Sequence, residues 1–133
     1  MNNQIEMYND VELTSEVMSA SSHRLIQLLF ENVLQRMKLA KLTMINNNHN
    51  EKLKHLSKAC SIFEYLRLCL KAEDKKSQEL TELLSLIYIR SEKNLFYAGL
   101  KNDVSYIDET ILMISNVKEG WDGIKDKVGA EHV

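Results

Sequence analysis

The sequence lacks proline and contains only 4 glycines among its 133 residues. Proline breaks helix interiors and glycine weakens them, so the scarcity of both favours helix along almost the whole chain. The length is that of one domain, since a typical domain has about 100–200 residues. A chain of this size can bury roughly two-thirds of its unfolded surface, which makes a real hydrophobic core feasible.

The sequence also lacks a large excess of charge of either sign, and it lacks long apolar runs. The formal net charge is -2 with no basic stripe, which argues against nucleic acid as a partner. The longest apolar runs, such as residues 111–114, are far too short to span a bilayer, so membrane insertion is not expected. The stretch MNNQIEMYND does not resemble a secretory signal, and we expect a cytoplasmic protein.

Catalytic and metal-binding patterns are absent from the sequence as well. Its 4 histidines have no metal-ligand spacing, and neither a Glu-x-x-His pair nor a glycine-rich phosphate loop occurs. The 2 cysteines, Cys60 and Cys69, fall on opposite faces of one predicted helix about 13 Å apart along its axis, too far for a disulfide. We therefore expect no catalytic residue, no cofactor and no metal, and we predict that the protein is not an enzyme.

Apolar residues recur at intervals of three and four, which predicts four helices. They begin after Ser22, near Glu51, near Glu79 and at Val104, and each has about 20 residues with a short link to the next. Their predicted core stripes are Ile26, Leu29, Val33, Met37, Ala40 and Met44; Leu53, Leu56, Cys60, Phe63, Leu66 and Leu70; Leu80, Leu84, Ile87, Tyr88, Leu95 and Ala98; and Val104, Ile107, Ile111, Ile114, Val117, Trp121 and Ile124. The predicted fold is all-α, an antiparallel up-down-up-down four-helix bundle with an N-terminal arm or short extra helix. The expected single domain comprises the arm over 1–20, the bundle over 21–126 and a frayed tail over 127–133.

Two of these helices carry more large apolar residues than one buried stripe can hold. On a helical wheel, Leu28, Leu39 and Leu42 fall nearly opposite the core stripe of the first helix, and Phe96 and Tyr97 belong to a similar surplus on the third. Such a surplus predicts an interaction surface that suits an amphipathic helix of a partner. The alternatives are ordinary scattered surface leucines, or a cover formed by the N-terminal arm.

Two further functions stay open at this point. His55, followed by LSKA, is a near match to a histidine phosphotransfer pattern, although the usual leucine and glycine of that pattern are absent. The surplus apolar face could instead join two copies of the chain in a homodimer, as a helical interaction module.

Several segments together resemble the flagellar secretion chaperones, the flagellin-specific FliS family. They are VMSASSHRLIQLLF from Val17, LSKACSIF from Leu56, Tyr88, and AGLKND from Ala98, and they occur in the order of the predicted helices. The arm YNDVELTSEV is similar to the enterobacterial form of the family. The family usually has proline in place of Ser22 and often asparagine in place of Gly99, which leaves open a divergent paralogue acting on a second flagellin.

The resemblance implies a cytoplasmic export chaperone that binds the disordered C-terminal region of flagellin. It would prevent premature polymerisation and help deliver flagellin to the export gate of the flagellar type III apparatus. The resemblance also implies that Met7 and Tyr8, in the arm, lie over part of the binding surface. The candidate partner-binding residues are Met7, Tyr8, Leu28, Leu39, Leu42, Phe96 and Tyr97.

Overall fold

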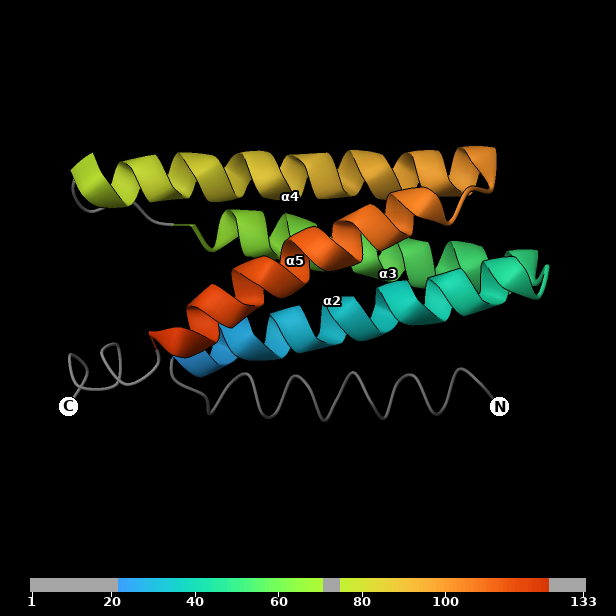
Figure 1. The fold of residues 1–133 in the computed structure, drawn as a ribbon, viewed down its shortest axis with the longest axis horizontal. Coiled ribbons are helices and arrows are strands. Elements are labelled where there is room, and N and C mark those ends of the chain that lie inside the picture. The colour runs from blue at the N-terminus through green and yellow to red at the C-terminus, as the bar shows by residue number, and fades with distance from the viewer. Residues whose placement is uncertain (1–21, 71–74, 125–133) are drawn as a thin grey trace.

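A computed structural model describes residues 22–70 and 75–124 of the chain. Those ranges contain four helices and no strand: α2 (Ser22–Ile45), α3 (His49–Leu68), α4 (Lys75–Lys101) and α5 (Ser105–Gly123). The predicted all-α four-helix bundle is confirmed (Figure 1). The predicted arm over 1–20 and tail over 127–133 lie outside the described residues.

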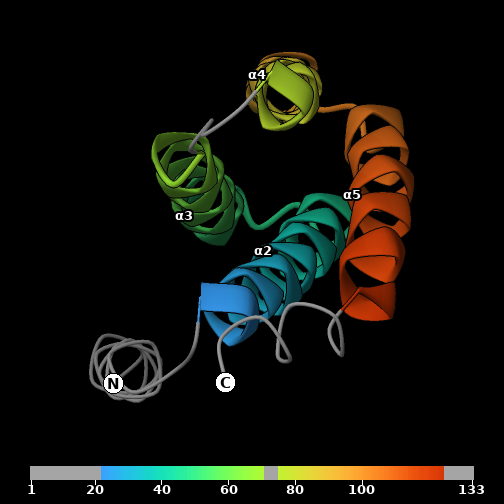
Figure 2. The ribbon, with the colours of Figure 1, turned by 90° about the vertical axis from the view of Figure 1, so that its left-hand side faces the viewer.

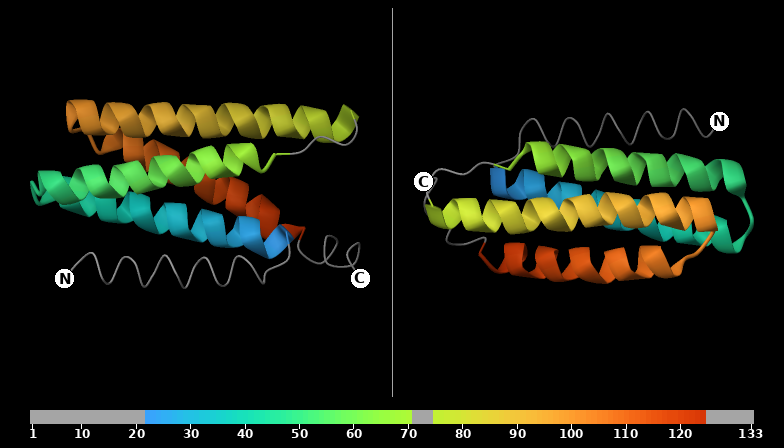
Figure 3. Two further views of the ribbon diagram at one scale, coloured as in Figure 1. Left: turned by 180° about the vertical axis from the view of Figure 1, so that it is seen from behind. Right: turned by 90° about the horizontal axis from the view of Figure 1, so that it is seen from above.

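Each helix packs against the helices that precede and follow it, and α5 closes the bundle against α2. The end-on view in Figure 2 shows α2 and α4 at opposite corners, with α3 and α5 between them on either side. The view from behind, at the left of Figure 3, shows that α5 runs obliquely to α4. The first turns of α5 contact both α4 and α2, through the Lys101–Tyr106 and Lys41–Asp108 hydrogen bonds. Its last turns contact α2, through the Gln27–Asp122 hydrogen bond.

Asparagine residues make the two short links. Asn47 and Asn102 adopt positive φ angles of 57° and 52° at the ends of α2 and α4, a conformation that asparagine tolerates better than most residues. The Asn48 side chain accepts a hydrogen bond from the Glu51 backbone N–H, so α3 begins at His49, slightly earlier than predicted. Asp103 accepts a hydrogen bond from the Ser105 backbone N–H at 2.9 Å, although the N-cap position of α5 is held by Val104.

The core follows the predicted apolar stripes over most of their length. Its fully buried members include Val33 and Met37 on α2, Phe63 on α3, Leu95 on α4 and Ile114 on α5. Phe63 and Tyr88 form a tilted ring pair with centroids 6.3 Å apart, so α3 and α4 are joined at mid-height by aromatic packing.

Three residues of the predicted stripes are exposed instead: Leu53, Leu80 and Ile124. Leu53 is 60% exposed, near the beginning of α3. Leu80 is 55% exposed although it lies on the core side of α4, because α5 has left α4 and crossed to α2 at that level. Periodicity identifies the apolar side of a helix, but it does not show where the neighbouring helix ends or turns away.

A reciprocal pair of hydrogen bonds joins the first turn of α2 to the last turn of α5. The Trp121 indole N–H donates to the His23 carbonyl at 3.0 Å, and the His23 ring Nε2 lies 2.9 Å from the Trp121 carbonyl. A carbonyl oxygen only accepts, so Nε2 carries the ring proton. The two rings also stack with centroids 4.7 Å apart. Trp121, predicted as a core residue, packs against the core and also fixes this end of the bundle.

Asp122 strengthens the same end and makes its stability depend on pH. The hydrogen bond from Lys118, together with one from Gln27, holds the pKa of Asp122 below its usual value of 3.8. A lowered folded-state pKa stabilises the fold above the unfolded-state pKa, and this contribution is lost as the pH falls through the folded-state pKa.

We expect Asp122→Asn to lower the urea midpoint at pH 7 by a modest amount, since the carboxylate is partly exposed. The difference between the variant and the parent should shrink as the pH is lowered below about 4, where the parent loses the same carboxylate. Urea unfolding at a series of pH values measures this difference. A difference that stays constant down to strongly acidic pH would contradict the assignment.

Candidate partner-binding surface

Large apolar side chains are exposed on all four helices, and half of them belong to α4. Those on α4 lie either on its outer side, away from the core, or in its first turns, which α5 does not cover. The exposed set is Leu42, Ile45, Leu53, Tyr65, Leu68, Leu80, Leu83, Leu86, Ile89, Phe96, Tyr97, Leu100, Leu112 and Ile124. A concentration of this kind on one helix is typical of an interaction surface rather than of scattered exposure.

Two contacts set the register of α3 against α4. The Lys52 ammonium lies 3.4 Å from the Gly99 carbonyl, and Arg67 donates to Glu92 at 3.3 Å. The beginning of α3 therefore lies beside the end of α4. Lys52 is buried and places its positive charge at the C-terminal end of α4, where the helix dipole favours a cation.

With this register, exposed apolar residues of α3 and α4 lie along one common border. At about 100° per residue, Leu53 emerges on the side of α3 next to α4 and Phe96 on the side of α4 next to α3. Leu68 and Leu100 lie farther round, on the adjoining outer sides of the same two helices. Ile89 extends the row toward the middle of α4. We refer to Leu53, Leu68, Ile89, Phe96 and Leu100 as the α3/α4 face.

An aromatic cluster supports the end of this face. The Phe96 and Tyr97 rings meet edge to face at 5.7 Å, and Tyr97 packs on Tyr106 of α5 at 5.8 Å. The Lys101 ammonium lies over both tyrosine rings and hydrogen-bonds the Tyr106 hydroxyl at 3.1 Å. That hydrogen bond raises the pKa of Lys101 above its usual value. Because these contacts already restrict the Phe96 and Tyr97 side chains, the two side chains lose less conformational entropy when a partner binds.

The predicted binding residues have different positions in the structure. Phe96, Tyr97 and Leu42 are exposed, and Leu39 is half-buried. Leu28 was predicted on the exposed side of its helix, and that placement is wrong, since the side chain is only 6% exposed. Met7 and Tyr8 lie outside the described residues.

The structure does not bring the exposed predicted residues into one patch. Leu42 lies on α2 and Phe96 and Tyr97 on α4, and these helices occupy opposite corners of the bundle (Figure 2). The α3 half of the α3/α4 face was missed, because Leu53 was assigned to the core. A signal for the α4 half was present in the sequence, since residues 86, 89, 93, 96 and 100 repeat at steps of three and four.

His55 is poorly placed for phosphotransfer. It is 8% exposed, and Arg36 lies 3.3 Å from its Nδ1. A guanidinium can only donate, so Nδ1 accepts and the ring proton sits on Nε2, which faces Glu51 at 3.7 Å. A phosphoryl acceptor must offer a ring nitrogen to its donor, and this arrangement offers neither, so the geometry argues against the phosphotransfer alternative.

Other chemistry is equally unsupported in the described ranges. Burial, with a smaller effect of the Glu92 charge, raises the pKa of the Cys60 thiol to about 11, opposite to the shift that a nucleophilic cysteine requires. Residues 22–70 and 75–124 contain no group of three or more His, Cys, Asp or Glu side chains that could hold a metal ion. Within the same ranges no helix is both long and apolar enough to cross a membrane.

The fold and its surface define the class of protein: a helical bundle whose uncovered apolar side chains suit contact with other proteins. Comparison with known proteins gives the family. The model of the family described as "Flagellar protein FliS" matches residues 2–128, so the chain belongs to the FliS family.

Named relatives agree with this assignment. The chain is 38% identical over 117 residues to the flagellar secretion chaperone FliS of Escherichia coli K12, covering 87% of this chain and 85% of the relative. It is 35% identical over 120 residues to the flagellar secretion chaperone FliSB of Pseudomonas aeruginosa, covering 90% and 94%. The flagellar secretion chaperone FliS of Vibrio cholerae is 30% identical over 124 residues, covering 93% and 90%.

Proposed function

We propose that this protein is a cytoplasmic, non-enzymatic secretion chaperone of the flagellum whose client is flagellin. It binds the disordered C-terminal region of newly made flagellin, prevents its premature polymerisation and helps deliver it to the gate of the flagellar type III export apparatus. Membership of the FliS family and the names of the relatives support the chaperone role. The flagellin client follows from the resemblance on which the family was first inferred.

The observation that carries the proposal is the α3/α4 face. Its apolar side chains run along the border of two helices, which suits the apolar stripe of a client segment that becomes helical on binding. Burial of apolar surface stabilises by about 25 cal/mol per Å², so several hundred Å² can offset the cost of ordering the client. By family resemblance, Met7 and Tyr8 of the N-terminal arm lie over part of the binding surface until the client replaces them. They and Leu28, Leu39 and Leu42 of α2 remain candidate contacts for a client that wraps around the bundle.

Calorimetry with a peptide from the C-terminal region of the host's flagellin tests the proposal. We expect submicromolar binding, on the order of -8 kcal/mol or stronger. We also expect the binding enthalpy to become more negative as temperature rises, since apolar burial gives a negative heat-capacity change. The peptide should gain helical circular dichroism when it binds.

A peptide with the same composition in scrambled order is the control, because it keeps the hydrophobicity but loses the helical stripe. Equal binding of the two peptides would mean that the face attracts any apolar chain. No detectable binding heat at several temperatures, together with no change in the peptide's circular dichroism, would overturn the flagellin proposal.

A further inference from the structure

The α3/α4 face is not apolar along its whole length, because a charged pair lies near its middle. On α3, Arg67 follows Leu53 by two steps of seven residues, so the two side chains leave the helix only about 40° apart. On α4, Glu92 lies between Ile89 and Phe96 of the face, three residues after the one and four before the other. The Arg67 guanidinium donates to the Glu92 carboxylate at 3.3 Å across the border of the two helices. One ion pair therefore interrupts the apolar face.

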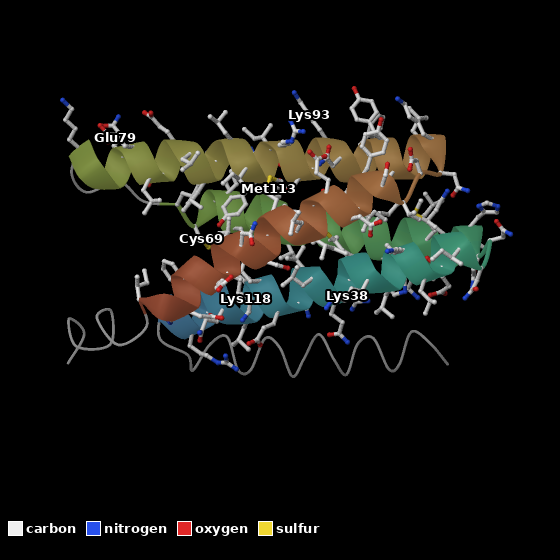
Figure 4. All side chains as sticks on the ribbon, in the orientation of Figure 1. Lys38, Cys69, Glu79, Lys93, Met113 and Lys118 are labelled. Carbon is white, nitrogen blue, oxygen red and sulfur yellow. The ribbon has the colours of Figure 1, made fainter. Side chains whose placement is uncertain are left out.

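Neighbouring positions show how Glu92 turns toward α3. In Figure 4, Lys93 points away from the bundle, on the side of α4 opposite the core. Glu92 precedes it by one residue, about 100° round the helix, and reaches Arg67 of α3. The Glu92 charge also adds to the effect of burial in raising the pKa of Cys60. Cys60 lies midway between Leu53 and Arg67 along α3, so the carboxylate lies beside the central turns of that helix.

The hydrogen-bonding capacity of this pair is only partly used. Both side chains are half-buried, with Arg67 38% and Glu92 24% exposed. The Arg67 Nη2 donates to Glu92, whereas its buried Nε–H has no hydrogen-bond partner among the residues that the structure describes. A client segment seated on the face would remove the remaining water from the pair. Unless the client supplied hydrogen bonds of its own, polar groups of both side chains would be buried without partners, which costs free energy.

We propose that the client segment presents an asparagine or glutamine side chain to the Arg67–Glu92 pair, and that this contact selects the client and sets its register on the α3/α4 face. The inference rests on the proposed function, in which this face binds a client segment. The oxygen of the client amide accepts from the Arg67 guanidinium, and its NH₂ group donates to the Glu92 carboxylate. One neutral side chain thus satisfies both members of the pair.

The opposite charges of the pair favour an amide over the other kinds of side chain. A client carboxylate could accept from Arg67 but would lie close to the Glu92 carboxylate, and a client lysine or arginine would lie close to the Arg67 guanidinium. Like charges brought together in an interface are destabilising. An apolar side chain would leave both groups unpaired, which is how a hydrogen-bonding site rejects an analogue that lacks the polar group.

A single polar contact within an apolar stripe also fixes the register of two helices, as one asparagine does in a coiled coil. With the amide on the pair, apolar client residues on one side of it meet Ile89, and those on the other side meet Leu53 and Phe96. A shift of one turn would place an apolar residue on the pair and the amide on an apolar side chain. The pair therefore discriminates against apolar helices that lack the amide.

A double-mutant cycle tests the proposal. The double variant Arg67→Met, Glu92→Leu makes the centre of the face apolar, and such replacements of an ion pair often leave stability unchanged. In the flagellin peptide, each Asn, Gln, Asp and Glu is replaced in turn by leucine, and calorimetry measures binding to both proteins. At one Asn or Gln position, leucine should weaken binding to the parent chain by roughly tenfold or more, yet leave binding to the double variant unchanged or stronger. Loss of fold could not produce that pattern, since it would weaken all the peptides alike.

Arg90→Met is the matched control, because Arg90 also lies on α4 and pairs with a glutamate, but that glutamate is Glu109 of α5. This variant should distinguish the peptides as the parent chain does. A peptide that binds but shows no coupled position, or is coupled only at Asp or Glu, would overturn the amide contact and leave the proposed function intact. A peptide that does not bind the parent chain would overturn the proposed function, and this inference with it.

Discussion

Replacing Phe63 with alanine is expected to lower the free energy of unfolding by about 3–5 kcal/mol. The Phe63 side chain is 0% exposed and belongs to the core that all four helices share, where it packs beside Tyr88. Its removal loses the burial of a whole ring and leaves a cavity that the helix backbones can fill only in part. Since small domains are stable by about 5–15 kcal/mol, the variant loses a large share of its stability.

Urea unfolding followed by far-ultraviolet circular dichroism measures this loss. Tyr65→Ala is the matched control, because Tyr65 lies on the same helix but is 47% exposed, and it should cost about 1 kcal/mol or less. Similar losses in the two variants would mean that Phe63 is not at the centre of the core.

The double variant Leu53→Ala, Phe96→Ala is expected to weaken binding of the flagellin peptide by about a hundredfold or more. The two residues lie on opposite sides of the α3–α4 border, so a helix seated on the face would contact both. Each contact that becomes fully buried contributes about 1.5–3 kcal/mol, and every 1.4 kcal/mol is about tenfold in affinity. Stability should change little, because both side chains are exposed in the free protein.

Leu112→Ala is the control for this experiment. Leu112 is a comparably exposed leucine on α5, away from the α3–α4 border, and its removal should leave affinity within about twofold of the parent. Calorimetry under identical conditions compares the variants. An unchanged affinity in the double variant would move the client site away from the α3/α4 face and toward the α2 residues.

The helices and most of the core could be predicted from the sequence because both depend on the types and spacing of residues close together in the chain. Absence of proline and a three-and-four apolar spacing suffice to define a helix and its buried side. Val33, Met37 and Ile114 were accordingly placed correctly in the core. The links also depend on local order, since Asn47 and Asn102 adopt positive φ angles and Asp103 accepts a hydrogen bond from the nearby Ser105 backbone N–H.

The binding surface was less predictable because exposure depends on what the other helices cover. Leu53 follows the spacing of a core residue and is exposed, whereas Leu28 lies far from the core stripe and is buried. A helical wheel gives the direction of a side chain but not the neighbour that it meets. The α3/α4 face needs two helices in a definite register, and the contacts of Lys52 and Arg67 that set this register join residues far apart in the chain.

By itself, the sequence determined the helical class, the positions of the four helices and the short links between them. These features depend on interactions that span only a few residues. It also carried the segments that resemble the FliS family. Only the tertiary structure decided which surplus apolar residues stay accessible, because the oblique path of α5 uncovers one end of α4 and because α2 and α4 occupy opposite corners of the bundle. Burial is a property of the packed bundle, and no single helix contains it.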